Sequence, residues 1–175
     1  MTAEPPVLPA DSKDWTWVIA QGCPECGWTP PPSDEIASRV RATVPRWRAV
    51  LNRDDVAART RPERWSALEY GCHVRDVCRV FAGRLDQLLT EDNPTFADWD
   101  QDAAALDGHY YAEDPAGVAD DYERGAEQIA SGFAAVRADQ WERKGTRSNG
   151  LLFTVATLGA YFLHDLEHHL VDVDG

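Results

Sequence analysis

The sequence predicts an all-α protein, a four-helix bundle preceded by an irregular N-terminal extension. Two observations support this fold class. Apolar residues recur at spacings of three and four in four separate segments, and very little of the chain shows the alternation that is typical of strands. A chain of 175 residues is long enough for one domain with a substantial core. We expect an arm at residues 1–32 and a bundle at residues 33–175.

The first helix is expected after the three prolines at 30–32. Ser33 is a suitable N-cap, and Asp34 and Glu35 favour the positive end of the helix dipole. Pro45 should kink this helix rather than end it, because the apolar stripe continues beyond the proline. The stripe consists of Ile36, Val40, Val44, Trp47 and Leu51.

The second helix has the clearest start. Ser66 and Glu69 fit a capping box, in which each side chain bonds the other residue's backbone N–H. Trp65 and Tyr70 are placed to form a hydrophobic staple across this start. The helix should run to about Thr90, with a core stripe of Val74, Val77, Cys78, Phe81, Leu85 and Leu88.

The third and fourth helices are separated by a turn-rich link at residues 139–153. A long loop at residues 91–113 precedes the third helix, which should begin with Asp114 as cap and Pro115 at its first position. Thr154 can cap the fourth helix. The third stripe consists of Ala119, Tyr122, Ala126, Ile129, Phe133 and Val136, and the fourth of Val155, Leu158, Phe162 and Leu166.

Composition excludes several classes of protein. The net charge of −13 repels phosphate backbones, so we expect no nucleic-acid partner. We find no apolar run long enough to span a membrane and no signal peptide, so we expect no membrane partner and a cytoplasmic location. In that compartment four cysteines favour free thiols, metal ligands or redox groups over structural disulfides.

The strongest functional signal is a histidine pair on the fourth helix. His164 and His168 are four residues apart, so their side chains lie one turn apart on one face and can grip one divalent metal. A third ligand would leave one coordination position open for chemistry. His73 on the second helix is the best candidate because it flanks the core stripe, and His109 in the long loop is a weaker one.

The predicted metal site is therefore His73, His164 and His168. Zinc suits such a site best, although nickel, iron and copper also accept imidazole. Asp76, one turn after His73, is expected to orient an imidazole or to bind substrate. His169 points about 100° away from His168, which favours a supporting or surface role over ligation. The alternative is a solvated histidine pair near the negative end of the helix dipole.

Several segments resemble the DinB/YfiT-like superfamily of metalloenzymes, which includes proteins similar to mycothiol-dependent maleylpyruvate isomerase. The matching segments cover roughly residues 60–172. They are residues 65–77, 99–102, 141–145, 153–158 and 164–169. The resemblance implies a four-helix bundle with a metal between helices, held by His73, His164 and His168.

The resemblance also implies a function. Low-molecular-weight thiols such as mycothiol or bacillithiol are the typical co-substrates in that superfamily, so a thiol S-transferase or thiol-dependent isomerase acting on an electrophilic small molecule is expected. The Ala- and Arg-rich, Lys-poor composition fits a high-GC organism such as an actinomycete, and such an organism would favour mycothiol as the thiol. A metal-dependent hydrolase and a non-enzymatic metal- or redox-responsive binding protein are the alternatives. A homodimer through a bundle face is compatible with all three.

The N-terminal arm carries a CxxC motif, Cys23 and Cys26, outside the region of resemblance. Three interpretations remain open at the level of sequence. The motif is a redox dithiol, a tight turn with inert thiols, or half of a metal site. In the last case His109 completes it, or it reaches the histidine-bound metal. Cys72 and Cys78 are expected to be buried as small apolar residues.

Overall fold

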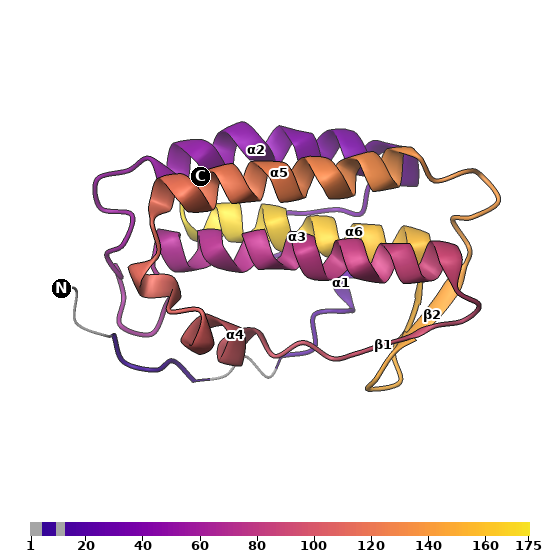
Figure 1. Cartoon of the computed structure of the whole chain (residues 1–175), viewed down its shortest axis with the longest axis horizontal. Helices are drawn as coiled ribbons and strands as arrows, with labels where there is room; N and C mark the ends of the chain where they lie inside the picture. The colour runs from indigo at the N-terminus through magenta and orange to yellow at the C-terminus, as the bar shows by residue number, and fades with distance from the viewer. Residues whose placement is uncertain (1–4, 10–12) are drawn as a thin grey trace.

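Four long helices form the body of the protein. The computed structural model describes residues 5–9 and 13–175. The helices pack in two layers, one of α2 beside α5 and one of α3 beside α6 (Figure 1). This arrangement confirms the predicted four-helix bundle. The helices are α2 (Ile36–Leu51), α3 (Ala67–Thr90), α5 (Pro115–Ala134) and α6 (Val155–Asp172).

Local capping chemistry sets where three of these helices begin, as predicted. The Ser66 and Glu69 capping box is present at the start of α3. The rings of Trp65 and Tyr70 lie 5.5 Å apart, as a hydrophobic staple requires. Asp114 accepts a hydrogen bond from the backbone of α5, and Thr154 accepts one from the backbone of α6.

The start of α2 differs from the prediction. Ser33 does not cap the helix with its side chain; it begins a short 3-10 turn, η1 (Ser33–Glu35), that leads into α2. Pro32 cannot supply a capping side chain either, so the turn itself guides the chain into the helix. Pro45 lies inside α2, and the helix continues to Leu51 as the apolar stripe indicated.

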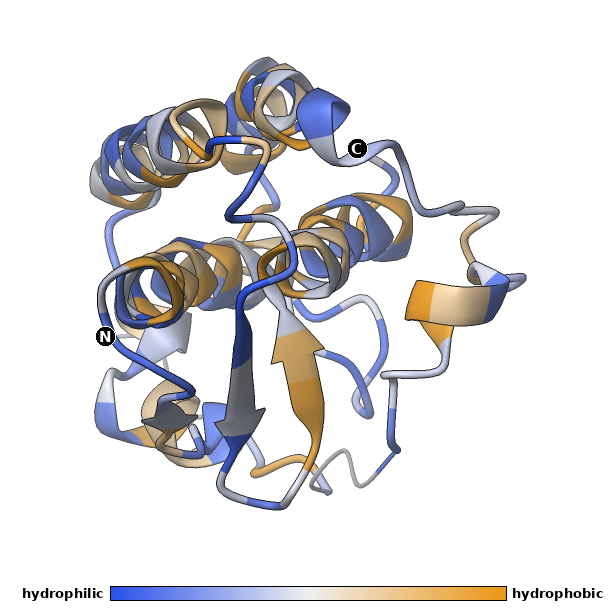
Figure 2. Ribbon diagram, turned by 90° about the vertical axis from the view of Figure 1, so that its right-hand side faces the viewer, coloured by the Kyte–Doolittle hydropathy of each residue, from blue (hydrophilic) through white to orange (hydrophobic). Residues whose placement is uncertain are grey.

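The two segments predicted as loops contain short regular elements. The segment 91–113 holds β1 (Thr95–Phe96), α4 (Gln101–Asp107) and η2 (Tyr110–Ala112), and the segment 139–153 holds most of a hairpin, β2 (Lys144–Arg147) and β3 (Leu152–Thr154). β1 pairs with β2 in parallel and β2 with β3 antiparallel. Strands this short give no readable alternation in the sequence. Figure 2 shows β2 and β3 side by side beneath the α3 and α6 layer.

The core lies between the two layers. It is built from the four predicted stripes, and its largest wholly buried side chains include Trp47, Tyr122, Phe133 and Phe162. Cys72 and Cys78 are also buried, as predicted. None of the helices in the described part of the chain is long and apolar enough to cross a membrane.

The described part of the N-terminal arm runs along the outer side of the α3 and α6 layer (Figure 1). It contains one helical turn, α1 (Val18–Gln21), which contacts α6. Val18, Cys23 and Trp28 form a small apolar cluster with Ala160 of α6. The irregular structure predicted for residues 1–4 and 10–12 lies outside the described residues.

Candidate metal centre

Helix α6 carries five side chains of metal-binding type within six residues, and four of them form two pairs. His164 and His168 are four residues apart, and so are Asp165 and His169. Each pair therefore lies on one face of the helix, and the second face is turned about 100° from the first. The two faces meet different neighbours. Within the described residues they form two separate groups of potential ligands.

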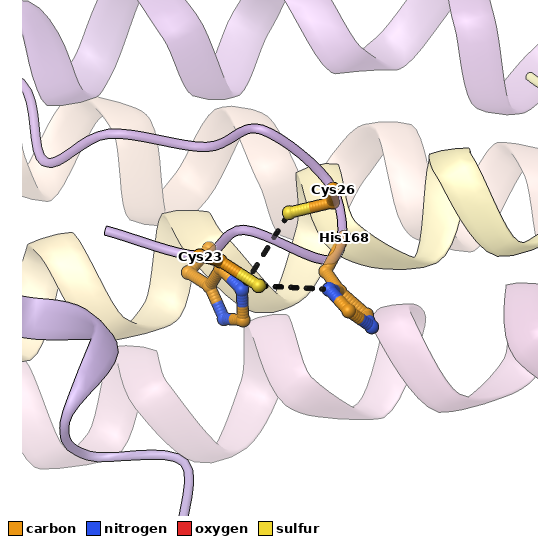
Figure 3. Close-up of side chains that lie close together, drawn as sticks. Cys23, Cys26 and His168 are labelled. Atoms are coloured by element: carbon orange, nitrogen blue, oxygen red, sulfur yellow. Dashed lines mark hydrogen bonds between the residues drawn. The ribbon is translucent and has the colours of Figure 1, made fainter. Parts of the chain in front are cut away.

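The first group joins α6 to the N-terminal arm, and we call it the sulfur cluster. Its members are Cys23, Cys26, His164 and His168, and their four ligand atoms all lie within 4.8 Å of one another. Cys23 Sγ is 3.8 Å from His168 Nδ1, and Cys26 Sγ is 3.8 Å from His164 Nε2. In Figure 3 a dashed line joins the Cys23 sulfur to His168, and the Cys26 sulfur lies close to this pair.

Two tryptophans pack against the histidines of the sulfur cluster. The ring of Trp15 lies 4.9 Å from that of His168, and the ring of Trp28 lies 5.1 Å from that of His164. Burial lowers the pKa of His164 to about 4, and the neighbouring His168 adds to this shift. Burial also raises the pKa of Cys26 to about 11. In the absence of a cation these groups are therefore neutral at pH 7.

The second group joins α6 to α3, and we call it the carboxylate cluster. Its members are His73, Asp165 and His169. Asp165 stands between the two imidazoles: its Oδ2 is 3.4 Å from His73 Nε2, and its Oδ1 is 3.1 Å from His169 Nε2. The two imidazole rings are 5.0 Å apart.

The charges in the carboxylate cluster are strongly coupled. Burial opposes ionisation of Asp165, but the adjacent His73 and His169 outweigh burial and lower its pKa well below the ordinary value. Burial likewise opposes a charge on His169, but hydrogen bonds to Asp165 and Asp172 outweigh it and raise its pKa to about 9. With this pKa, His169 carries a positive charge beside the Asp165 carboxylate at pH 7.

Asp172 orients the His169 ring of the carboxylate cluster. It accepts a hydrogen bond of 2.8 Å from His169 Nδ1, which leaves His169 Nε2 directed at Asp165. A carboxylate that holds the far nitrogen of a ligating histidine is a recurring feature of metal sites. The same Asp172 carboxylate lies 3.6 Å from His168 Nε2, so it contacts both clusters.

His73 shows that the carboxylate cluster fits a metal ion. Its side chain is 1% exposed, yet neither ring nitrogen has a hydrogen-bond partner among the described residues. Trp65 and Trp99 cover the ring, and Trp99 is stacked on it at 5.6 Å. His73 Nε2 lies 3.4 Å from Asp165 Oδ2 without a hydrogen bond, and a buried imidazole that lacks hydrogen bonds is costly unless another ligand satisfies it. Two imidazoles and one carboxylate are a donor set that zinc and iron accept.

A cleft of about 840 Å³ gives access to both clusters. His164, Asp165, His168 and His169 all line it, whereas His73 lies behind its wall. The arm forms one side of the cleft, and the segment that contains Trp99 and α4 forms another. At one end, four residues of the bundle and the hairpin line the wall, namely Phe81, Arg84, Arg147 and Tyr161.

The structure divides the ligand set expected from the sequence. His164 and His168 lie together as predicted, but their neighbours are Cys23 and Cys26. His73 faces Asp165 and His169 instead. The reason is the direction of the second α6 face, which points at α3.

Two other predicted residues lie outside both clusters. His109 is exposed, and its Nδ1 contacts the backbone of Asp107, so it completes neither group. Asp76 is buried and accepts a hydrogen bond from the Tyr110 hydroxyl and another from Arg75.

Sequence reasoning missed Asp165 and His169 as potential ligands. The signal was present, because Asp165 and His169 repeat the four-residue spacing of the histidine pair. The angle between His168 and His169 does not by itself reveal this second pair, which appears only when residue 165 is considered with residue 169. The N-terminal motif could not be placed at all, since no local pattern tells which helix an irregular arm will cover.

Comparisons with known proteins agree with this fold. The sequence model of the DinB superfamily matches residues 51–172. The structure of YfiT from Bacillus subtilis, described as a probable metal-dependent hydrolase with an unusual four-helix bundle topology, superposes with a TM-score of 0.72. The match covers 81% of this chain and 85% of that one at 16% sequence identity, and so shows the fold alone. No curated protein matches the chain.

Proposed function

Since the chain belongs to the DinB superfamily, we propose that it is a metal-dependent hydrolase whose cation is held by His73, Asp165 and His169. The observation that carries this proposal is the buried His73 ring. It has no hydrogen-bond partner among the described residues, and it faces a carboxylate and a second imidazole at the wall of a large cleft.

A divalent metal in this cluster would act as a Lewis acid and lower the pKa of a bound water. The protein's own residues supply the rest. Asp172 fixes the orientation of His169, and Trp65 and Trp99 hold the His73 ring and exclude solvent from it. With three protein ligands, His73, Asp165 and His169, a bound metal would keep coordination positions for water or substrate, as catalytic metal sites require.

The end of the cleft that is lined by Arg84 and Arg147 favours an anionic group on the substrate. The pKa of Arg84 is lowered by its burial and by the nearby positive charge of Arg147, and the opposing effect of Asp98 does not compensate. Arg147 Nε is buried and has no hydrogen-bond partner in the described structure. Arg84 donates one hydrogen bond to the Ala97 carbonyl, and the other N–H groups of the two guanidinium groups would gain from pairing with a carboxylate or phosphate.

The test is hydrolysis of small chromogenic esters by protein loaded with zinc, nickel, manganese or iron. We expect metal-dependent cleavage of the anionic 4-nitrophenyl hemisuccinate or 4-nitrophenyl phosphate in preference to neutral 4-nitrophenyl acetate. His73→Ala should lower the rate at least about 100-fold, since loss of the cation removes its stabilisation of developing charge. Equal rates in His73→Ala and wild-type protein would contradict the proposal.

A thiol-dependent S-transferase or isomerase is the second candidate, because a cleft of this volume can hold a mycothiol-type thiol beside an electrophile. The thiolate would then take the coordination position that water takes in the hydrolase. Cobalt-substituted protein distinguishes the two, since a thiolate ligand adds a sulfur-to-metal charge-transfer band. The titration must use the Cys23→Ser/Cys26→Ser variant, so that sulfur from the protein does not contribute.

A new band on adding the thiol favours the transferase. A spectrum that responds only to anionic substrate analogues favours the hydrolase. Stoichiometric metal with neither response would leave a non-enzymatic, metal-responsive binding protein as the better description.

A further inference from the structure

We propose that Cys23, Cys26, His164 and His168 form a second, structural zinc site that fastens the N-terminal arm to α6. This inference does not depend on the proposed hydrolase activity, which concerns the carboxylate cluster. It assigns a role to the CxxC motif, and it makes the position of the arm conditional on a metal ion.

The distances fit a tetrahedral site. Zinc binds cysteine sulfur at about 2.3 Å and histidine nitrogen at about 2.0 Å, so sulfur and nitrogen ligands of one ion are separated by about 3.6 Å. Both sulfur-to-nitrogen distances in the sulfur cluster are 3.8 Å, and all four ligand atoms lie within 4.8 Å of one another. Only a small contraction is needed for all four to reach one ion.

The backbone around the motif is shaped to present both sulfurs on the same side. Cys23 N–H donates to the Trp28 carbonyl at 2.7 Å, which closes a tight turn. Gly22 and Gly27, on either side of the motif, have φ angles of 73° and 74°, a region that favours glycine. The backbone N–H of Trp28 is directed at the Cys26 sulfur. Such a bond stabilises a thiolate ligand.

The site is complete without water. Two thiolates and two imidazoles fill the four positions of a tetrahedral ion, which is the pattern of a structural rather than a catalytic zinc site. The packing agrees, since Cys23 is 2% exposed and Trp28 is 5% exposed. The mixed sulfur and nitrogen donors also favour zinc over magnesium or calcium, which prefer oxygen.

If zinc fastens the arm to α6, the position of the arm as a wall of the cleft depends on that zinc ion. Lys13, Asp14 and Trp15 of the arm line the cleft, and they lie eight to ten residues before Cys23 in the same segment. The apolar cluster that fastens this segment to α6 is small. A structural zinc ion supplies folding free energy directly, so its loss should release the arm and open the cleft.

The first test uses His73→Ala protein, in which the carboxylate cluster is disabled and the sulfur cluster is intact. After loading with one equivalent of zinc, X-ray absorption at the zinc edge should show two sulfur scatterers at about 2.3 Å and two nitrogen scatterers at about 2.0 Å. Cobalt in the same protein should give a sulfur-to-metal charge-transfer band with no added thiol. Absence of sulfur scattering would overturn the proposal.

Variants localise the site. Cys23→Ser/Cys26→Ser should bind one zinc ion per chain where the wild type binds two. Cys78→Ala is the matched control, because Cys78 is buried on α3 outside both clusters, and it should still bind two. Zinc content unchanged in the double variant would refute the site. So would a Cys23–Cys26 disulfide in protein purified under reducing conditions, because the thiolates would then be unavailable.

A protease readout tests the role of the arm. Lys13 is the only trypsin site in residues 1–32. Chelation of the metal, or the double serine variant, should accelerate cleavage after Lys13 at least about tenfold, since the arm loses the binding energy of the ion. Unchanged cleavage would contradict the fastening role. Because His73→Ala retains the sulfur cluster, its arm should remain protected even if the proposed hydrolase activity fails.

Discussion

The rings of His168 and His169 lie 5.6 Å apart and nearly perpendicular, and each belongs to a different ligand cluster. Consecutive residues on a helix point about 100° apart, so one turn of α6 can serve two sites on two sides. His168 faces the arm, and His169 faces α3. Asp172 contacts both rings and so ties the two clusters to one carboxylate.

Removal of Asp172 should weaken metal binding in the carboxylate cluster without removing a ligand. In Asp172→Asn, His169 loses the carboxylate that orients its ring, and we expect metal affinity to fall about 10–100-fold. The measurement is a competition titration with a chromogenic chelator. Glu167→Gln is the control, because Glu167 lies on the same helix but pairs with Arg39 of α2. Equal losses in both variants would argue against an orienting role.

Arg147 should contribute to binding of an anionic substrate. Arg147→Gln is expected to raise KM for 4-nitrophenyl hemisuccinate about tenfold, the loss of one charge-assisted hydrogen bond, with little effect on kcat. KM for neutral 4-nitrophenyl acetate should not change. Arg137→Gln serves as control, because Arg137 is exposed and pairs with Asp139 outside the cleft. An equal rise in KM for both esters would contradict the assignment.

The pair of Glu69 and Arg59 should make stability depend on pH. Burial alone would raise the pKa of Glu69, but hydrogen bonds from Arg59 and Ser66 outweigh burial and lower it below 4.5. A carboxyl whose pKa is lower in the folded than in the unfolded state stabilises the fold at pH values above its unfolded pKa. This contribution is lost as the pH falls through the folded pKa. Glu69→Gln should lower the free energy of unfolding by roughly 3 kcal/mol at pH 7.

Denaturant titrations at several pH values check this prediction. The difference between wild-type and Glu69→Gln protein should be constant above about pH 5 and should shrink below about pH 4. A difference that does not change across this range would mean that the Glu69 charge contributes nothing.

Two helical glycines should respond oppositely to alanine. A Cβ at Gly159 of α6 would lie 2.7 Å from Ile36 Cδ1 and 2.8 Å from a Phe133 ring carbon, so Gly159→Ala should destabilise the fold by about 1–3 kcal/mol. A Cβ at Gly83 of α3 would meet nothing within 4 Å. Gly83→Ala should therefore stabilise it by about 0.5–1 kcal/mol. Thermal unfolding of both variants measures the two changes in stability. A Gly159→Ala variant more stable than the wild type would contradict the close packing of Gly159 against Ile36 and Phe133.

Local signals explain how much of the fold was predictable. The caps at Ser66, Asp114 and Thr154 and the apolar stripes depend only on neighbouring residues, so the starts of α3, α5 and α6 were predicted to the residue. The pairing of β1 with β2 depends on residues about 50 apart in sequence, which no local pattern reveals. The cap of α4 is also a local signal, since Asp100 accepts hydrogen bonds from two following N–H groups, although residues 91–113 are predicted as a loop from the sequence.

The candidate site was predictable only in part for the same reason. Periodicity places His164 and His168 on one face, but it cannot say which partner that face meets. The arm that carries Cys23 and Cys26 has no periodicity, and its contact with α6 is a tertiary one. Most of the candidate ligand residues were therefore predictable from the sequence, but their division into two clusters was not.

The most direct test of this account is a crystal structure of the full chain grown with zinc, with anomalous data collected at the zinc edge. The account predicts two separate peaks. One should lie among Cys23, Cys26, His164 and His168, and the other among His73, Asp165 and His169. A single peak bound by His73 together with His164 and His168 would contradict the division of α6 into two metal-binding faces.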